Sequence, residues 1–241
     1  EPFTIQPMIA EGNFFAILPA TGTAFTAIGC PAYTLTGTAF QEASSVASRR
    51  ARIKRTRVHV TTAAVNAVAG VRINASIPLT VNGGLAWEGG FLGVMHGGPA
   101  TGVTNSSHRF FMGLHDTGAP SDVNPSTLLR ICGIGYDSAD TQLEFMHNDA
   151  SGAATKIPLG ASFPKPTADL THMYRLRLFA KPGTARELRY EVTNLANRAV
   201  AVGIITADLP LVSDLLVPKM FVSSGGVSAV AGVAVGPVSF Q

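Results

Sequence analysis

One short stretch of the sequence, QLEFMHNDASGAATKIPLG at residues 142–160, carries residue types that could do chemistry. His147, Asn148 and Asp149 stand in a row, and Lys156 follows seven residues after the aspartate. These residues could border a catalytic or metal-binding site, or they could form a turn between two strands. Apolar residues alternate with polar ones on both sides of an Asn, Asp, Ser and Gly cluster, which indicates a β-hairpin. We expect the turn, because Asn and Asp tolerate left-handed backbone and cap their own turns.

Other candidates for catalysis are one short motif and a set of carboxylates. The motif HDTG at residues 115–118 contains Asp-Thr-Gly, which opens aspartic-protease sites, but a single short copy in a loop-like context does not predict that activity. A glycosidase needs two carboxylates held about 5–10 Å apart. The candidates for such a pair are Asp116, Asp137, Asp140, Glu144 and Asp149. Asp137, Asp140 and Asp149 could also ligate calcium, although no EF-hand loop is present. With no phosphate loop, GxSxG elbow or HExxH motif, we expect no catalytic, metal-binding or cofactor-binding residues.

Recognition of a glycan usually requires an aromatic side chain on which a sugar ring can stack. Trp87 is the one tryptophan, and it lies between glycines in NGGLAWEGGFLG. The glycines could expose Trp87 on a loop, or they could let a core tryptophan approach a bend, and we favour the core. The candidate glycan contacts are Trp87, His115 and Asp116.

Much of the positive charge lies in one strip, SRRARIKRTRVHV. The strip comprises Arg49, Arg50, Arg52, Lys54, Arg55 and Arg57. The whole chain has 18 basic and 15 acidic residues and a net charge of +3. Without the six residues of the strip, 12 basic and 15 acidic residues would remain, and the net charge would be negative. Such a strip could bind a polyanion. No aromatic residue is interleaved to stack bases and no nucleic-acid-binding motif surrounds it, so we expect an inter-subunit contact or a solvated sheet edge, and no nucleic acid.

The composition favours a protein that packs against copies of itself or against neighbours. Charged residues make up 14% of the 241 residues, against roughly 25% in an average domain. No apolar run reaches the roughly 18 residues of a membrane helix, so we expect no membrane insertion. Cys30 and Cys132 allow at most one disulfide, and we expect Cys132, in the apolar run LLRICGIGY, to be a buried free thiol.

Period-two alternation between Gly, Pro, Asn, Asp and Ser clusters predicts many short strands. The expected strands lie near residues 55–62, 71–79, 88–95, 108–114, 128–137, 141–147, 154–159, 173–180, 187–194, 200–206, 219–223 and 228–240. The last part, from residue 173, reads as a meander with one apolar and one charged face, and a weak helical pattern follows at 211–216. We therefore predict an all-β antiparallel sandwich over residues 49–241, preceded by an irregular arm or attachment segment over residues 1–48.

The run from residue 109 to 241 resembles the terminal, lectin-like domains of tail-fibre and related appendage proteins of tailed bacteriophages. The segments that carry this resemblance, in order, are RFFMGL, NPSTLLRICGIGYDSADTQLEFMHNDASGAATKIPLGASFP, YRLRLFAKP, YEVTNL and GGVSAVAGVAVGPVSF. The resemblance implies a concanavalin-like or laminin-G-like jelly roll, often trimeric, on the virion surface. It also implies that HNDASG is a hairpin within the sandwich.

The function expected from this resemblance is that of a non-enzymatic virion protein for host attachment. Its partners would be other copies of the chain, which the resemblance implies form a trimer, together with other virion proteins and a host-surface glycan or protein. The long shaft typical of fibres is absent here, so a capsid decoration, collar or baseplate protein with the same sandwich is an alternative. A carbohydrate-binding module and a polysaccharide depolymerase are further alternatives.

Overall fold

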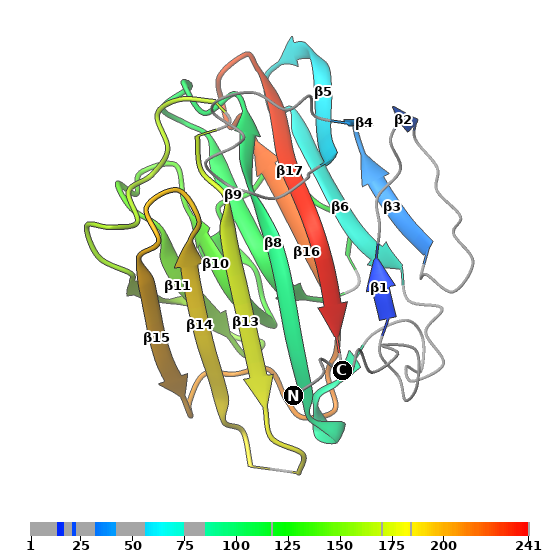
Figure 1. The fold of residues 1–241 in the computed structure, drawn as a ribbon, viewed down its shortest axis with the longest axis vertical. Coiled ribbons are helices and arrows are strands. Elements are labelled where there is room, and N and C mark those ends of the chain that lie inside the picture. Colours follow the sequence, from blue (N-terminus) through cyan, green and yellow to red (C-terminus); the bar gives the residue numbers. More distant parts are fainter. Residues whose placement is uncertain are drawn as a thin grey trace, which may run out of the picture.

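The structure is a computed structural model that describes residues 14–16, 21–22, 32–41, 56–74, 85–116, 118–169, 171–183 and 185–240. In these residues two antiparallel sheets face each other as a sandwich (Figure 1). The predicted all-β antiparallel sandwich is thus confirmed. Helical structure is confined, in the part of the chain described, to short 3-10 turns such as Trp87–Gly89 and Pro125–Thr127. None of the helices found there has the length and apolar character needed to cross a membrane.

The first sheet has the strand order β15-β14-β13-β8-β17-β5-β4-β2, and β1 pairs with β17. Its strands are β1 (Phe14–Ala16), β2 (Thr21–Gly22), β4 (Thr38–Gln41), β5 (Thr56–Ala64), β8 (Phe91–Thr101), β13 (Tyr174–Ala180), β14 (Leu188–Asn194), β15 (Val200–Ile205) and β17 (Ala229–Phe240). The strands β13, β14 and β15 pair in chain order. The meander predicted for this region is therefore confirmed.

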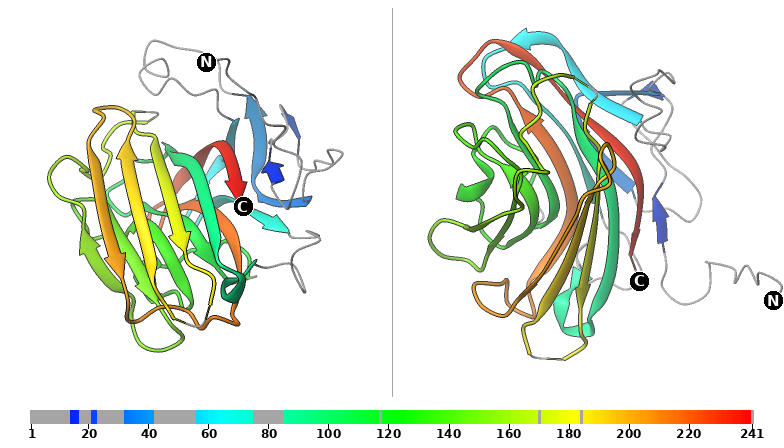
Figure 2. Two further views of the ribbon diagram at one scale, coloured as in Figure 1. Left: turned by 60° about the horizontal axis from the view of Figure 1, so that its bottom comes forward. Right: turned by 60° about the vertical axis from the view of Figure 1, so that its left-hand side comes forward.

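The second sheet has the order β12-β11-β10-β9-β16-β6-β3, and β7 pairs with β16. Its strands are β3 (Ala32–Thr36), β6 (Val68–Asn74), β7 (Leu85–Ala86), β9 (Arg109–His115), β10 (Ile131–Tyr136), β11 (Glu144–Asn148), β12 (Thr155–Pro158) and β16 (Leu215–Ser223). Figure 2 shows in its right-hand view that the two sheets bow in the same direction. The outer face of the second sheet is consequently concave, and long loops lie on that side.

The main core lies between the sheets because alternate residues of each strand point inward. Phe145 on β11 and Tyr190 on β14 join the two layers, with their rings stacked at a centroid distance of 4.0 Å. A smaller apolar cluster covers the other face of the second sheet, and it includes Phe111, Ile131 and Phe221. Strands of the second sheet such as β10 are therefore buried on both faces, which explains their nearly continuous apolar sequence.

Each strand predicted from residue 55 onward overlaps a strand of the structure. The helix expected at residues 211–216 is wrong. Leu211 and Asp214 close a turn instead, in which the Leu211 N–H donates to Asp214 Oδ2 at 2.7 Å. The Asp214 N–H donates back to the Leu211 carbonyl at 2.9 Å. This aspartate favours a turn over a helix because its side chain competes for backbone N–H groups, and β16 begins directly after it.

Part of the segment expected to be an irregular arm forms strands in the structure. β3 pairs with β6, and β4 pairs with β5, so residues 32–41 add a strand to each sheet. Gly37 makes the connection with φ +100°, and a Cβ there would lie 2.6 Å from the His59 carbonyl oxygen. Leu35 also packs against the main core. The division of the chain at residue 48 stays a prediction, since most of residues 1–48 lie outside the described residues.

Candidate functional site

Three of the carboxylates considered for a glycosidase or calcium site converge on one lysine. Lys156 Nζ lies 3.2 Å from Asp137 Oδ2, 2.5 Å from Asp140 Oδ1 and 2.9 Å from Glu144 Oε2. Burial raises the pKa of Glu144, and nearby Asp140 raises it further, while the hydrogen bond from Lys156 opposes the shift. For Lys156, burial lowers the pKa but the hydrogen bonds to Asp140 and Glu144 outweigh it, so the net shift is upward.

This lysine occupies the place that a bound cation would take among the carboxylates. Its ammonium supplies the positive charge that Asp137, Asp140 and Glu144 need when water is partly excluded. Across the described ranges, no group of three or more His, Cys, Asp or Glu side chains is arranged to hold a metal ion. We therefore interpret this cluster, called here the Lys156 cluster, as a structural ion network.

The residues His147, Asn148 and Asp149, in the stretch 142–160, also have structural contacts. Asp149 Oδ1 accepts hydrogen bonds from the N–H groups of Ala150 and Ser151, at 2.5 and 2.9 Å, which lowers the pKa of Asp149. His147 points to the core side, is 5% exposed, and donates from Nδ1 to the Asp208 carbonyl at 2.8 Å. The loop joins β11 to β12 as a hairpin, so the turn interpretation is confirmed.

A different set of polar residues meets at the end of β9. Lys219 on β16 donates from Nζ to His115 Nδ1 at 2.5 Å, and His115 Nε2 lies 3.2 Å from Asp116 Oδ1. Because Nδ1 accepts from the ammonium, the imidazole proton must be on Nε2, directed at Asp116. Asp116 Oδ1 also accepts from the Gly118 N–H at 3.0 Å. We call His115, Asp116 and Lys219 the polar chain.

The polar chain runs from the protein interior to the surface. Lys219 is 1% exposed, whereas the Asp116 side chain is 39% exposed. Burial lowers the pKa of His115 to about 4, and the charge of Lys219 adds to that shift. Burial also lowers the pKa of Lys219 to about 8, with a smaller raising effect of Asp116. At neutral pH the imidazole is therefore neutral, and Asp116 presents an oriented carboxylate to solvent.

Sequence reasoning identified His115 and Asp116 as candidates but missed Lys219. The available signal was a lone lysine inside the apolar strand LLVPKMFVS. Its register places Lys219 opposite Gly113 on β9 and Arg72 on β6. That pairing is long-range, so the spacing in the sequence could not reveal it.

The structure also shows where Trp87, part of the basic strip and Cys132 lie. Trp87 is 0% exposed and packs edge-to-face on Phe91 at 5.9 Å, so its ring is not accessible as a glycan contact and the preferred core interpretation is confirmed. Of the strip, only Arg57 lies within the described residues, on β5, where it donates to Thr101 Oγ1 at 2.9 Å. Arg49, Arg50, Arg52, Lys54 and Arg55 lie outside the described residues. The buried free thiol predicted for Cys132 is confirmed.

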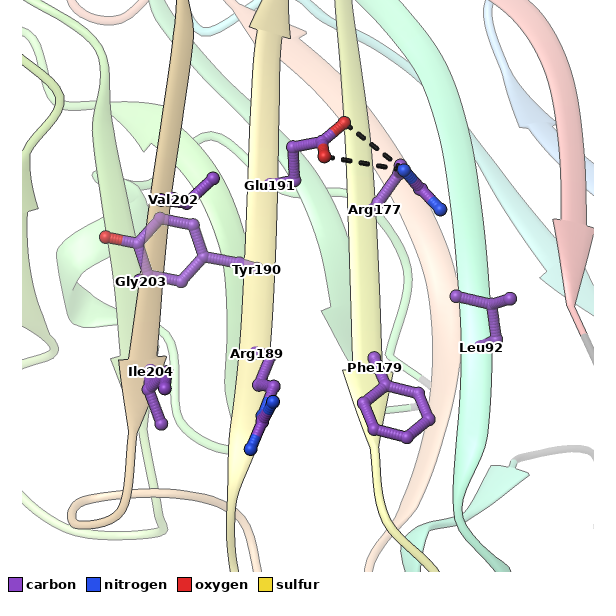
Figure 3. A pocket seen from close by; sticks show the side chains of 9 residues that line it. All are labelled: Leu92, Arg177, Phe179, Arg189, Tyr190, Glu191, Val202, Gly203 and Ile204. Atoms are coloured by element: carbon purple, nitrogen blue, oxygen red, sulfur yellow. Dashed lines mark hydrogen bonds and ion pairs between the residues drawn. The ribbon is translucent and has the colours of Figure 1, made fainter.

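The outer face of the first sheet contains an open depression of about 410 Å³ (Figure 3). It spans β8, β13, β14 and β15, and its lining includes Leu92, Arg177, Phe179, Arg189, Glu191, Val202 and Ile204. Arg177 and Glu191 are cross-strand neighbours at one end of it and form an ion pair, with Nη1 and Oε2 3.4 Å apart. Phe179, Val202 and Ile204 are 39%, 69% and 59% exposed. Sequence reasoning did not select this surface, although the uninterrupted apolar run VAVGII at β15 was visible.

Comparison with known proteins shows the class of fold. No protein-family model and no curated protein sequence matches the chain. Among solved structures, peanut lectin with a bound peptide aligns with a TM-score of 0.55 and 12% identity over 95% of this chain and 96% of that chain. Arcelin-5, a lectin-like defence protein from Phaseolus vulgaris, aligns with a TM-score of 0.53 and 10% identity, covering 96% and 99%. Lectin UEA-II in complex with galactose aligns with a TM-score of 0.53 and 11% identity, over 95% of this chain and 97% of that chain.

These similarities define the chain as a concanavalin-like, legume-lectin-like β-sandwich. The jelly-roll class expected from the sequence is therefore confirmed. At such low identities the likeness establishes the fold, and function must be argued from the surface of this chain.

Proposed function

We propose that this chain is a non-enzymatic structural protein of a bacteriophage virion, a tail-fibre or receptor-binding component that displays its lectin-like sandwich for host attachment. The observation that carries the non-enzymatic part is the Lys156 cluster, which engages Asp137, Asp140 and Glu144 in ion pairs. The sequence resemblance over residues 109–241 supports the virion role. A capsid decoration, collar or baseplate protein would use the same sandwich.

The virion role predicts that the chain is part of assembled particles in several copies. Mass spectrometry of density-purified particles should detect its peptides, and antibodies against the chain should bind intact particles. Purified chain should also compete with particles for adsorption to host cells. Particles that contain the chain but adsorb normally in the presence of excess chain would favour the decoration, collar or baseplate role. Absence of its peptides from purified particles would refute the virion role.

Glycan binding is a second candidate, and the polar chain favours it. Asp116 is oriented by His115 and by the Gly118 N–H, so a sugar hydroxyl would meet an acceptor that loses little freedom on binding. Asp116→Asn should weaken binding of a recognised glycan by about tenfold or more, since a charged acceptor is replaced by a neutral one.

The measurement for this prediction is calorimetric titration with a glycan selected on a glycan array. Asp149→Asn is the matched control, because Asp149 also accepts backbone N–H groups of its own turn and lies in another loop. Equal affinity of Asp116→Asn and the unaltered chain would contradict a role of Asp116 in glycan binding, and no binding to any array glycan would contradict the lectin role. Release of new reducing ends from a bound polysaccharide would instead support a depolymerase.

A further inference from the structure

The strand β15 is an edge of the first sheet, and it lacks the features that usually prevent an edge strand from pairing with another chain. In the part of the chain that the structure describes, β15 pairs with β14 on one side and with no strand on the other. Edge strands usually avoid pairing with other chains by means of charged residues, proline, bulges or short length. Val200–Ile205 contains no charged residue and no proline, and its register with β14 is uninterrupted.

The corresponding edge of the second sheet is protected in this way. β12 has four residues, TKIP, and among them are Lys156 and Pro158. The charge and the proline both discourage pairing with another strand. The contrast within one molecule indicates that the open character of β15 is specific to that edge.

The side chains of β15 are apolar on the exposed face as well. Val200, Val202 and Ile204 are 56%, 69% and 59% exposed, and all three point to the outer face of the first sheet. Single exposed apolar residues are common on protein surfaces, but adjacent ones on an unpaired strand form a site for association. Figure 3 shows Val202 and Ile204 on this strand, at the border of the depression.

We infer that β15 pairs with β15 of a second copy of this chain, antiparallel and about a two-fold axis at Val202. In that register Val202 lies opposite the partner's Val202, and Val200 lies opposite the partner's Ile204. Every exposed apolar side chain of the strand then has an apolar cross-strand neighbour. Arg198 lies opposite the partner's Thr206, so no like charges meet. The self-complementary match is what a two-fold contact requires.

The charges of the neighbouring strands disfavour face-to-face stacking of two copies over this surface. Arg175 and Arg177 pair with Glu191 on this outer face, and Arg189 pairs with Glu187. Stacking two such faces would remove these ion pairs from water, and the cost of desolvating them is unfavourable. Edge pairing leaves these side chains in solvent. The contact joins copies in pairs, unlike the expected trimer, and it does not depend on the virion role.

A cysteine cross-link tests the register directly. Opposed residues of antiparallel strands have Cα atoms about 4.5–5.5 Å apart, within the range that a disulfide spans. Val202→Cys should therefore form a covalent dimer under mild oxidation. Val200→Cys should not link to itself, but a mixture of Val200→Cys and Ile204→Cys chains should form a mixed dimer. The unaltered chain, with its native cysteines, and Val65→Cys, at a turn residue that is 56% exposed, are the controls.

The second test measures mass in solution by multi-angle light scattering over a concentration series. The unaltered chain should be a dimer at about 50 μM, and Val202→Lys should raise the dissociation constant by about 100-fold or more, because two ammonium groups would face each other at the axis. Val65→Lys should leave it unchanged. A monomer at that concentration, or an oligomer whose mass Val202→Lys does not alter, would overturn the inference. Loss of the oligomer in Val202→Lys without a Val202→Cys cross-link would overturn the two-fold register.

Discussion

Replacement of Lys156 by methionine should lower the free energy of unfolding by about 2–3 kcal/mol, which corresponds to a fall in Tm of about 5–10 °C. The variant would leave Asp137, Asp140 and Glu144 close together without a counter-charge. The full penalty for breaking a buried ion pair is about 3–5 kcal/mol. We expect less here because the Lys156 side chain is 24% exposed and water screens part of the repulsion.

The dependence on pH distinguishes charge repulsion from a simple packing defect. Repulsion among the three carboxylates acts only while they are ionised, so the folded variant binds protons more readily than its unfolded chain and the penalty is present at neutral pH. Acidification neutralises the carboxylates, and the deficit relative to the unaltered chain should shrink. Urea denaturation at pH 7 and near pH 4 measures both effects.

Lys181 provides the matched control for this experiment. It is 54% exposed and lies 3.5 Å from a single carboxylate, that of Glu187. Lys181→Met should therefore change the stability by less than about 0.5 kcal/mol. If Lys156→Met also stayed within that range, the Lys156 cluster would not be a structural ion network, and its carboxylates would again be available for another role.

Lys219→Met should have the opposite effect and stabilise the protein at pH 7, by about 1–3 kcal/mol. Burial lowers the pKa of Lys219 to about 8 from its ordinary value of 10.5. Keeping this buried amine protonated at pH 7 therefore costs folding free energy. Methionine has a similar length and no charge, so it should fill the same space. The lost hydrogen bond to His115 reduces the gain.

The sign of the pH effect follows from the lowered pKa. Between pH 8 and 10.5 the unfolded chain binds a proton at Lys219 that the folded chain has released, so the stability of the unaltered protein rises with pH in that window. The advantage of Lys219→Met should be complete below about pH 8 and should disappear near pH 10.5. Lys165, whose pKa is also lowered to about 8, is present in both proteins and cancels from the difference.

Chemical denaturation at pH 7, 9 and 10.5 measures this difference. A Lys219→Met variant that is less stable than the unaltered chain at pH 7 would show that the lysine is a net structural contributor. A more stable variant would show that the chain retains Lys219 at a cost to folding. If the same variant also bound glycan more weakly, Lys219 would be retained because it orients His115 and Asp116 for binding. Stability and function often conflict in this way at binding sites.

Local sequence patterns determined the strands and their buried faces in this protein. Leu176 and Leu178 alternate with charged residues on β13, and both are buried as the period of two predicts. The cluster after β11 predicted its hairpin because Asp149 binds N–H groups one and two residues ahead. The burial of Cys132 followed from the apolar run around it. Each of these properties depends on neighbours in the chain, so the sequence was sufficient.

The candidate sites depend on contacts that no local pattern records. Lys219 meets His115 across 104 residues of sequence because β16 and β9 pair in the second sheet. Asp137, Asp140 and Glu144 could be recognised as carboxylates, but only the pairing of β11 with β12 brings Lys156 to them. The apolar residues of β15 were equally visible, and only the order of strands makes β15 an edge. Strand order is set by the packing of the whole sandwich, so tertiary structure alone decided which charges are paired and which apolar residues remain exposed.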